Sequence, residues 1–151
     1  IHNNSGGKNM SENINVLDEI HKGACMGKDA ISFVLDKVED SSLKSELEKE
    51  YSEYDMIASK IEKVYHKYDD GEPHETNALN KMMTWYGIEM KTFTDQSSSK
   101  IAELLINGVN MGIIEGRKIL NNKKMNKKIN EIVSEYVTMQ EESVEALKKY
   151  L

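Results

Sequence analysis

The chain has 151 residues, with 20 lysine and arginine side chains against 26 aspartate and glutamate side chains, and a formal net charge of −6. This length suits a single domain. Arg117 is the only arginine, and proteins that bind nucleic acid usually carry an arginine-rich basic surface, so we expect no nucleic-acid partner. The single cysteine, Cys25, excludes an intrachain disulfide and a thiolate metal cluster. No stretch approaches the roughly 20 apolar residues of a membrane span, so we expect a cytoplasmic protein without a membrane partner.

The first nine residues are polar and contain glycine, without the apolar segment of a signal peptide. Met10, followed by Ser11 and Glu12, resembles a natural start. We therefore interpret residues 1–9 as a disordered leader or an expression remnant, and residues 10–151 as one domain. Lysine, asparagine and isoleucine are abundant while arginine is nearly absent, which is the composition expected from a bacterium with an AT-rich genome.

Two long helices are predicted in the first half of the chain. From Ile14 to Val38, apolar and small residues recur at alternating spacings of three and four, which is the pattern of a helix packed in a bundle. Ser42 is the expected N-cap of a second helix. This helix shows the same kind of spacing at Leu43, Leu47, Tyr51, Tyr54, Ala58, Ile61, Tyr65 and Tyr68.

A loop is expected at Asp69–Pro73, which contains the only proline and a helix-stopping glycine. The third helix then begins near Thr76 or Asn77. The polar segment Asp95–Ser99 interrupts it, and two interpretations remain open: a kink in one long helix, or a break with a new N-cap at one of the serines.

The helical pattern resumes from Lys100 to Asn121, and after a short turn the last helix runs from Met125 to Tyr150. Four helical runs joined by turns predict an all-α fold, an antiparallel up-down-up-down four-helix bundle whose third helix is kinked or broken.

Three glycines lie four residues apart in the second part of the third helix: Gly108, Gly112 and Gly116. Each costs the helix roughly 1 kcal/mol relative to alanine, so some interaction should offset this cost. One interpretation is a close approach of the first helix at Ala24 and Gly27. Another is a groove for a small ligand, and a third is a face for dimerisation.

Two polar residues interrupt the apolar stripe of the last helix: Gln140 and Ser143. Leaving a buried amide without a hydrogen bond costs roughly 1–3 kcal/mol, so these side chains need partners. They could pair with tyrosine hydroxyls across the bundle or line a small polar pocket. A ligand site, if the bundle has one, is expected here and along the glycines.

Metal binding and catalysis have weak support in the sequence. Di-iron bundles use a Glu-x-x-His motif on two helices, and this chain contains none. Glu53, Glu115 and His21 are the remaining candidates for an unusual metal site, and we expect no cofactor. Cys25 has no evident base, because His21 four residues earlier is interpreted as a chance helical neighbour. An enzyme is therefore not expected.

Three segments of the chain together resemble a known family: Glu46–Tyr68, Thr94–Gly116 and Asn130–Leu151. In helix layout, in the interrupted third helix and in the placement of small residues, the chain is similar to a bacterial family of uncharacterised ferritin-like helical bundles. The resemblance implies a ferritin-like bundle that lacks the metal ligands, and it implies no function for individual residues.

The function expected from these patterns is a non-catalytic bundle that acts through protein association, as a homodimer. Exposed apolar residues such as Ala30, Met56 and Ile106 would help to bury its self-complementary surface. One alternative is a divergent di-metal protein that handles iron or acts as an oxidoreductase. The second alternative is a small-ligand carrier that uses the glycine-lined groove.

Overall fold

The computed structural model describes residues 4–68, 73 and 81–151. In this part of the chain the structure contains helices and no strand, as the sequence predicted. The helices are α1 (Asn4–Leu35), α2 (Ser41–Tyr65), α3 (Lys81–Thr92), α4 (Ser98–Asn122) and α5 (Lys127–Lys148). None of the described helices is both long and apolar enough to cross a bilayer.

Two boundaries of the predicted elements need comment. Helix α1 begins at Asn4, well before the expected start at Ile14, so it extends into the segment interpreted as a leader. Of the predicted Asp69–Pro73 loop only Pro73 is described, and the expected start of the third helix lies outside the described residues.

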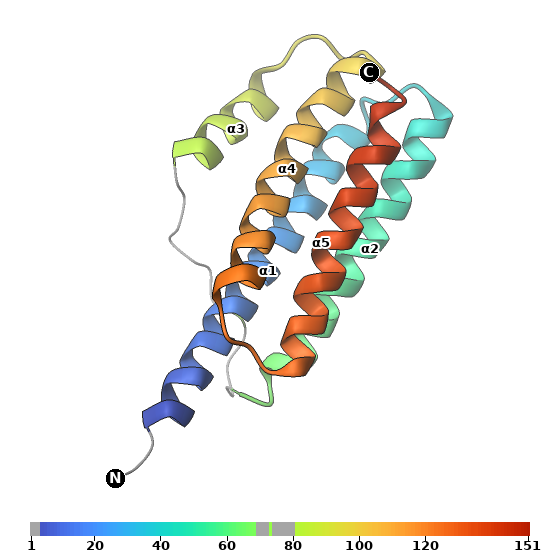
Figure 1. Cartoon of the computed structure of the whole chain (residues 1–151). Coiled ribbons are helices and arrows are strands. Elements are labelled where there is room, and N and C mark those ends of the chain that lie inside the picture. Colours follow the sequence, from blue (N-terminus) through green and yellow to red (C-terminus); the bar gives the residue numbers. More distant parts are fainter. Residues whose placement is uncertain (1–3, 69–72, 74–80) are drawn as a thin grey trace.

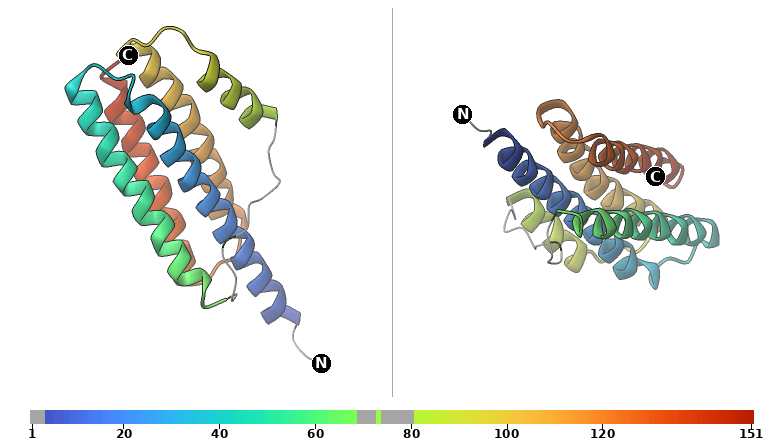
Figure 2. Two further views of the ribbon diagram at one scale, coloured as in Figure 1. Left: turned by 180° about the vertical axis from the view of Figure 1, so that it is seen from behind. Right: turned by 90° about the horizontal axis from the view of Figure 1, so that it is seen from below.

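The four long helices form two hairpins, α1 with α2 and α4 with α5, which pack against each other (Figures 1 and 2). Ion pairs mark the register of neighbouring helices. Lys28 Nζ lies 3.0 Å from Asp55 Oδ1 between α1 and α2, and Lys60 Nζ lies 2.7 Å from Glu135 Oε1 between α2 and α5. Such exposed pairs contribute at most about 1 kcal/mol each, so burial of apolar side chains is the main stabilising term.

The helices do not follow the up-down-up-down order of the prediction. Helices α1 and α5 run in one direction while α2 and α4 run in the other, because α3 leads the chain back along the outside of α4 before α4 begins (Figure 1). The polar segment near Asp95 is a break and not a kink. Asp95 Oδ1 accepts from the Ser97 amide at 2.9 Å, and Ser97 Oγ accepts from the Lys100 amide as the N-cap of α4.

The N-cap of α2 is Asp40 and not Ser42. Asp40 Oδ1 accepts from the Leu43 amide at 2.8 Å and thereby satisfies a backbone donor of the first helical turn. The Ser42 hydroxyl lies instead 2.7 Å from the Tyr150 hydroxyl, which connects the start of α2 with the end of the chain.

The inward stripe of α2 also differs from the prediction at one position. After Leu47 the strict alternation of spacings places Glu50 inside the bundle, where it is 3% exposed, and leaves Tyr51 at the surface with 37% exposed. The stripe continues through Tyr54 and Ile57. A carboxyl group therefore lies among the apolar side chains of the core.

The glycines of α1 and α4 make room for large side chains of the opposite helices. A Cβ atom at Gly27 would lie 2.7 Å from the ring of Tyr54, and one at Gly112 would overlap the amide of Gln140. Gly116 faces Val137 of α5 in the same way. The glycines thus accommodate side chains, which differs from the predicted close approach of α1 to α4.

We predict opposite effects for two glycine-to-alanine substitutions. Gly27→Ala should lower the free energy of unfolding by about 1–3 kcal/mol, because the rigid ring of Tyr54 occupies the space of the new methyl group. Gly87→Ala is the control, since nothing lies within 4 Å of its Cβ position in α3, and it should raise stability by up to about 1 kcal/mol. Urea unfolding followed by circular dichroism measures both. Equal effects would contradict this packing.

Candidate functional site

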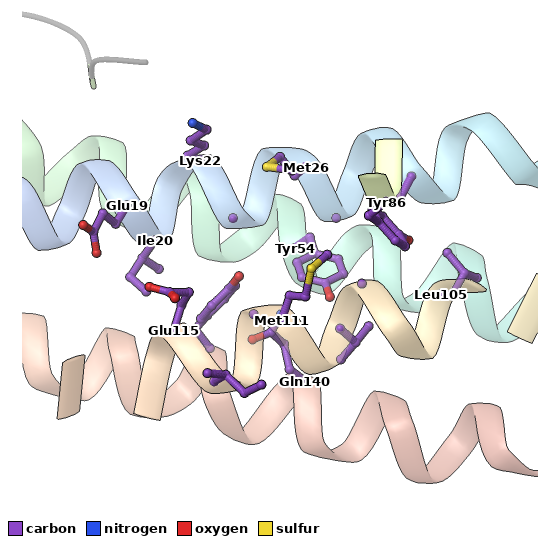
Figure 3. A pocket seen from close by; sticks show the side chains of 18 of the residues that line it. Glu19, Ile20, Lys22, Met26, Tyr54, Tyr86, Leu105, Met111, Glu115 and Gln140 are labelled. Atoms are coloured by element: carbon purple, nitrogen blue, oxygen red, sulfur yellow. The ribbon is translucent and has the colours of Figure 1, made fainter. Parts of the chain in front are cut away.

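A cavity of about 490 Å³ lies between α1 and α4, on the side of the bundle where the two hairpins meet (Figure 3). Helices α1 and α4 pack less closely on each other than the helices within either hairpin. Side chains of all five helices reach the wall of the cavity, with Tyr86 contributed by α3. The small residues Gly23, Gly27, Ala30, Gly108 and Gly112 line its two sides.

The residues predicted for a ligand groove are divided between the cavity and its surroundings. Gly108, Gly112 and Gln140 line the cavity. Gly116 is buried against α5, and Ser143 lies behind the wall, where its hydroxyl donates to Glu50. Three of the five predicted residues therefore line the cavity.

The polar part of the wall consists of two adjacent rungs that join α2 and α5. The first rung is Glu50 with Ser143, whose Oγ donates to Glu50 Oε1. The second rung is Tyr54 with Gln140, and the Gln140 amide acts to lower the pKa of both Tyr54 and Tyr136 against the effect of burial. Glu50 and Tyr54 are four residues apart on α2, and Gln140 and Ser143 are three residues apart on α5. The two rungs therefore lie one helical turn apart. All four side chains are at least 96% buried, as their exposed fractions are 3%, 4%, 3% and 2% in the order named.

Two oxygen atoms of these rungs lack a hydrogen-bond partner among the described residues: Glu50 Oε2 and Gln140 Oε1. Leaving a buried polar group without a hydrogen bond costs roughly 1–3 kcal/mol, and more for a charged group. Both residues line the cavity, and the two oxygen atoms themselves expose almost no surface.

Burial sets the protonation state of Glu50. Loss of solvent raises the pKa of its carboxyl to about 8; the hydrogen bond from Ser143 lowers the pKa, while the side-chain interaction with Glu46 and the negative charges of Glu46 and Glu53 raise it. The carboxyl group is therefore mainly protonated at neutral pH.

The tyrosines of the cavity remain protonated phenols. Burial raises the pKa of Tyr54 to about 12, while the amide of Gln140 lowers it slightly. Burial also raises the pKa of Tyr86 and Tyr136. The rings of Tyr54 and Tyr136 meet edge to face, with centroids 6.5 Å apart. They give the cavity a wall that is apolar apart from its hydroxyl groups.

Two exposed carboxylates, Glu19 of α1 and Glu115 of α4, line the rim of the cavity (Figure 3). Partial burial and the negative charge of Glu115 raise the pKa of Glu19, and the Lys123 ammonium lowers it. Lys22 also contributes to the rim, and its amino group points away from the gap between α1 and α4 (Figure 3).

The three candidate metal ligands lie in different places. Glu115 lies at the rim, Glu53 lies on the other side of the bundle within 3.9 Å of Lys49, and His21 Nε2 lies 3.0 Å from Glu62 Oε1. In the described parts of the chain, no three histidine, cysteine, aspartate or glutamate side chains gather closely enough to hold a metal ion.

Cys25 and His21 contact each other, as their four-residue spacing allows. Sγ lies 3.8 Å from Nδ1 and 3.9 Å from Nε2, so neither ring nitrogen is aimed at the sulfur in preference to the other. Burial raises the pKa of the Cys25 thiol, which disfavours the nucleophilic thiolate. This contact does not form an activated nucleophile.

The residues expected at a dimer surface do not share one face. Ala30 lines the cavity between α1 and α4, whereas Met56 is 57% exposed beside a shallow groove between α2 and α5. Ile106 is half-buried against the core. The homodimer stays a prediction.

Comparison with known proteins gives no relative for this chain: no family model, no curated protein and no solved structure matches it. Its function must therefore be argued from the cavity itself.

We predict that Glu50 makes the stability of the protein depend on pH. Between about pH 5 and pH 8 the folded carboxyl keeps a proton that the unfolded chain has released, so its contribution to stability decreases as the pH rises through about 8. The unfolding free energy of the wild type should fall relative to that of Glu50→Gln by up to about 1.4 kcal/mol per pH unit in this range. Urea unfolding at several pH values measures the difference. Parallel curves for the two proteins would contradict a buried protonated carboxyl.

Proposed function

We propose that the protein binds a small organic molecule in the cavity between α1 and α4. The observation that carries this proposal is the pair of unpartnered oxygen atoms, Glu50 Oε2 and Gln140 Oε1, on side chains that are at least 97% buried and line the cavity. At neutral pH the carboxyl proton lies on Glu50 Oε2, because Oε1 accepts from Ser143, so a ligand that brings one acceptor and one donor would satisfy both atoms.

The size and lining of the cavity support the same function. Ligand pockets of proteins have volumes of about 300–1,000 Å³ and apolar walls with a few polar groups, and this cavity of about 490 Å³ has such a wall. Met26 and Met111 reach it from α1 and α4, and methionine adapts its shape to different ligands (Figure 3).

We also propose a ferritin-like arrangement for the bundle. The support is the order of helix directions, in which a long connection containing α3 separates the two hairpins, as one crossover does in ferritin-like folds. Because the candidate metal ligands lie apart, this assignment carries no proposal of iron chemistry.

Binding of a fluorescent apolar probe tests the proposed function. N-phenyl-1-naphthylamine is neutral, brings one N–H donor, and becomes more fluorescent in apolar surroundings. Its emission should rise saturably with the wild-type protein. Ala30→Phe should abolish this rise while the helical signal in circular dichroism is preserved, because the new ring would fill the cavity from the half-buried face of α1.

The control is Ala146→Phe, which introduces the same ring at a half-buried alanine of α5 that does not line the cavity. This variant should bind the probe as the wild type does. An equal loss in both variants, or a wild type that does not bind the probe, would contradict the proposed function.

A further inference from the structure

Three tyrosine rings border the cavity, and each comes from a different helix. They are Tyr86 of α3, Tyr54 of α2 and Tyr136 of α5. The rings of Tyr54 and Tyr136 meet edge to face. Tyr54 also acts on the pKa of Tyr86, so these two side chains are neighbours as well. The tyrosines therefore form one aromatic cluster in the cavity wall.

Glycines of α1 and α4 give these rings their places. A Cβ atom at Gly23 would overlap the hydroxyl of Tyr136, and one at Gly108 would lie 2.5 Å from the hydroxyl of Tyr86. A glycine accommodates the ring of the third tyrosine in the same way. The rings thus reach across to α1 and α4 and take part in the wall on both sides of the gap.

Two methionines complete the apolar lining of the cavity. Met26 of α1 and Met111 of α4 are both partly buried, and Figure 3 shows them on the two sides of the gap. A thioether sulfur makes favourable contacts with an aromatic ring at a distance of about 5 Å. A ring between these helices therefore meets sulfur on two sides and the tyrosine cluster behind.

The charged groups of the cavity leave no net charge for a ligand to balance. Glu19 and Glu115 contribute two negative charges to the rim, and Lys22 and Lys118 contribute two positive ones. Further inside, burial raises the pKa of Glu50 and of the phenols, so these groups are mainly protonated at neutral pH. A charged ligand would lose its hydration here without gaining a charged partner, which is costly.

We propose, building on the proposed function, that the ligand is an uncharged aromatic molecule whose ring lies between Met26 and Met111 and against Tyr54. Aromatic rings attract one another in edge-to-face and offset arrangements beyond the effect of buried area, and sulfur adds a further attraction. An aliphatic ring of the same size gains only from burial of its apolar surface. The cavity therefore selects aromatic over aliphatic ligands.

Two alcohols that differ only in the ring test this selection: 2-phenylethanol and 2-cyclohexylethanol. Burial alone would favour the cyclohexyl ring, because it exposes the larger apolar surface in water. The wild-type protein should instead bind 2-phenylethanol at least about threefold more tightly. Proton–carbon NMR titration of protein labelled at the methionine methyl groups measures both affinities. The ring current of the phenyl group should also shift the methyl signals of Met26 and Met111.

Two variants locate the contact. Met111→Leu keeps the size of the side chain and removes the sulfur, so it should weaken binding of 2-phenylethanol by about two- to tenfold and leave that of 2-cyclohexylethanol unchanged. Met56→Leu is the matched control, since Met56 is 57% exposed beside the groove between α2 and α5, and it should change neither affinity. Exchanges of methionine for leucine usually preserve the fold, which circular dichroism checks.

Two charged analogues test the second part of the proposal: 2-phenylethylamine and 3-phenylpropionate. Each carries the same ring, and at pH 7 each should bind at least about tenfold more weakly than 2-phenylethanol, because its charge is desolvated without a partner. A charged analogue that binds as tightly as the alcohol would show that the ligand need not be uncharged, and the inference would be wrong.

The outcomes separate this inference from the proposed function. If both alcohols bind and 2-cyclohexylethanol binds equally or more tightly, the cavity takes ligands and the aromatic inference is wrong. Equal losses in Met111→Leu and Met56→Leu would also overturn it. If neither the alcohols nor N-phenyl-1-naphthylamine bind, the proposed function fails together with the inference.

Discussion

One buried carboxyl group sets the chemistry of the cavity wall. Glu50 accepts a hydrogen bond from Ser143 between α2 and α5, and its second oxygen has no partner among the described residues. Burying such a group is costly, and the fold limits the cost by keeping it protonated near neutral pH. A core made only for stability would place an apolar side chain here. The proposed ligand site rests on this carboxyl group.

The small residues of α1 and α4 explain why this carboxyl group borders a cavity. Gly27 of α1 makes room for Tyr54 of α2, and Gly112 of α4 makes room for Gln140 of α5. Both side chains therefore lie in the interior, with their polar ends beside Glu50. Helices α1 and α4 carry no large side chains at these positions, and space remains between them. The glycines of α1 and α4 thus leave room for the polar side chains that α2 and α5 contribute to the wall.

The sequence predicted the helical class, the interruption near Asp95, and the position of Gln140 and Ser143 inside the apolar stripe of the last helix. These features follow from spacing and polarity along a short stretch of the chain. It missed Glu50, since an extra four-residue step after Leu47 assigned Tyr51 to the core, whereas strict alternation places Glu50 there. The direction of α4 could not be predicted, because a kink and a reversal have the same local pattern and tertiary packing of α3 decides between them. The depth of the cavity depends on contacts between helices far apart in the sequence.

The most direct test of this account is the titration of Glu50 itself. Carbon-detected NMR of protein labelled at the glutamate side-chain carboxyl, assigned by comparison with Glu50→Gln, measures its pKa. The account predicts a midpoint near pH 8. A midpoint near the ordinary value of 4.5 would show a solvated carboxyl and contradict the account.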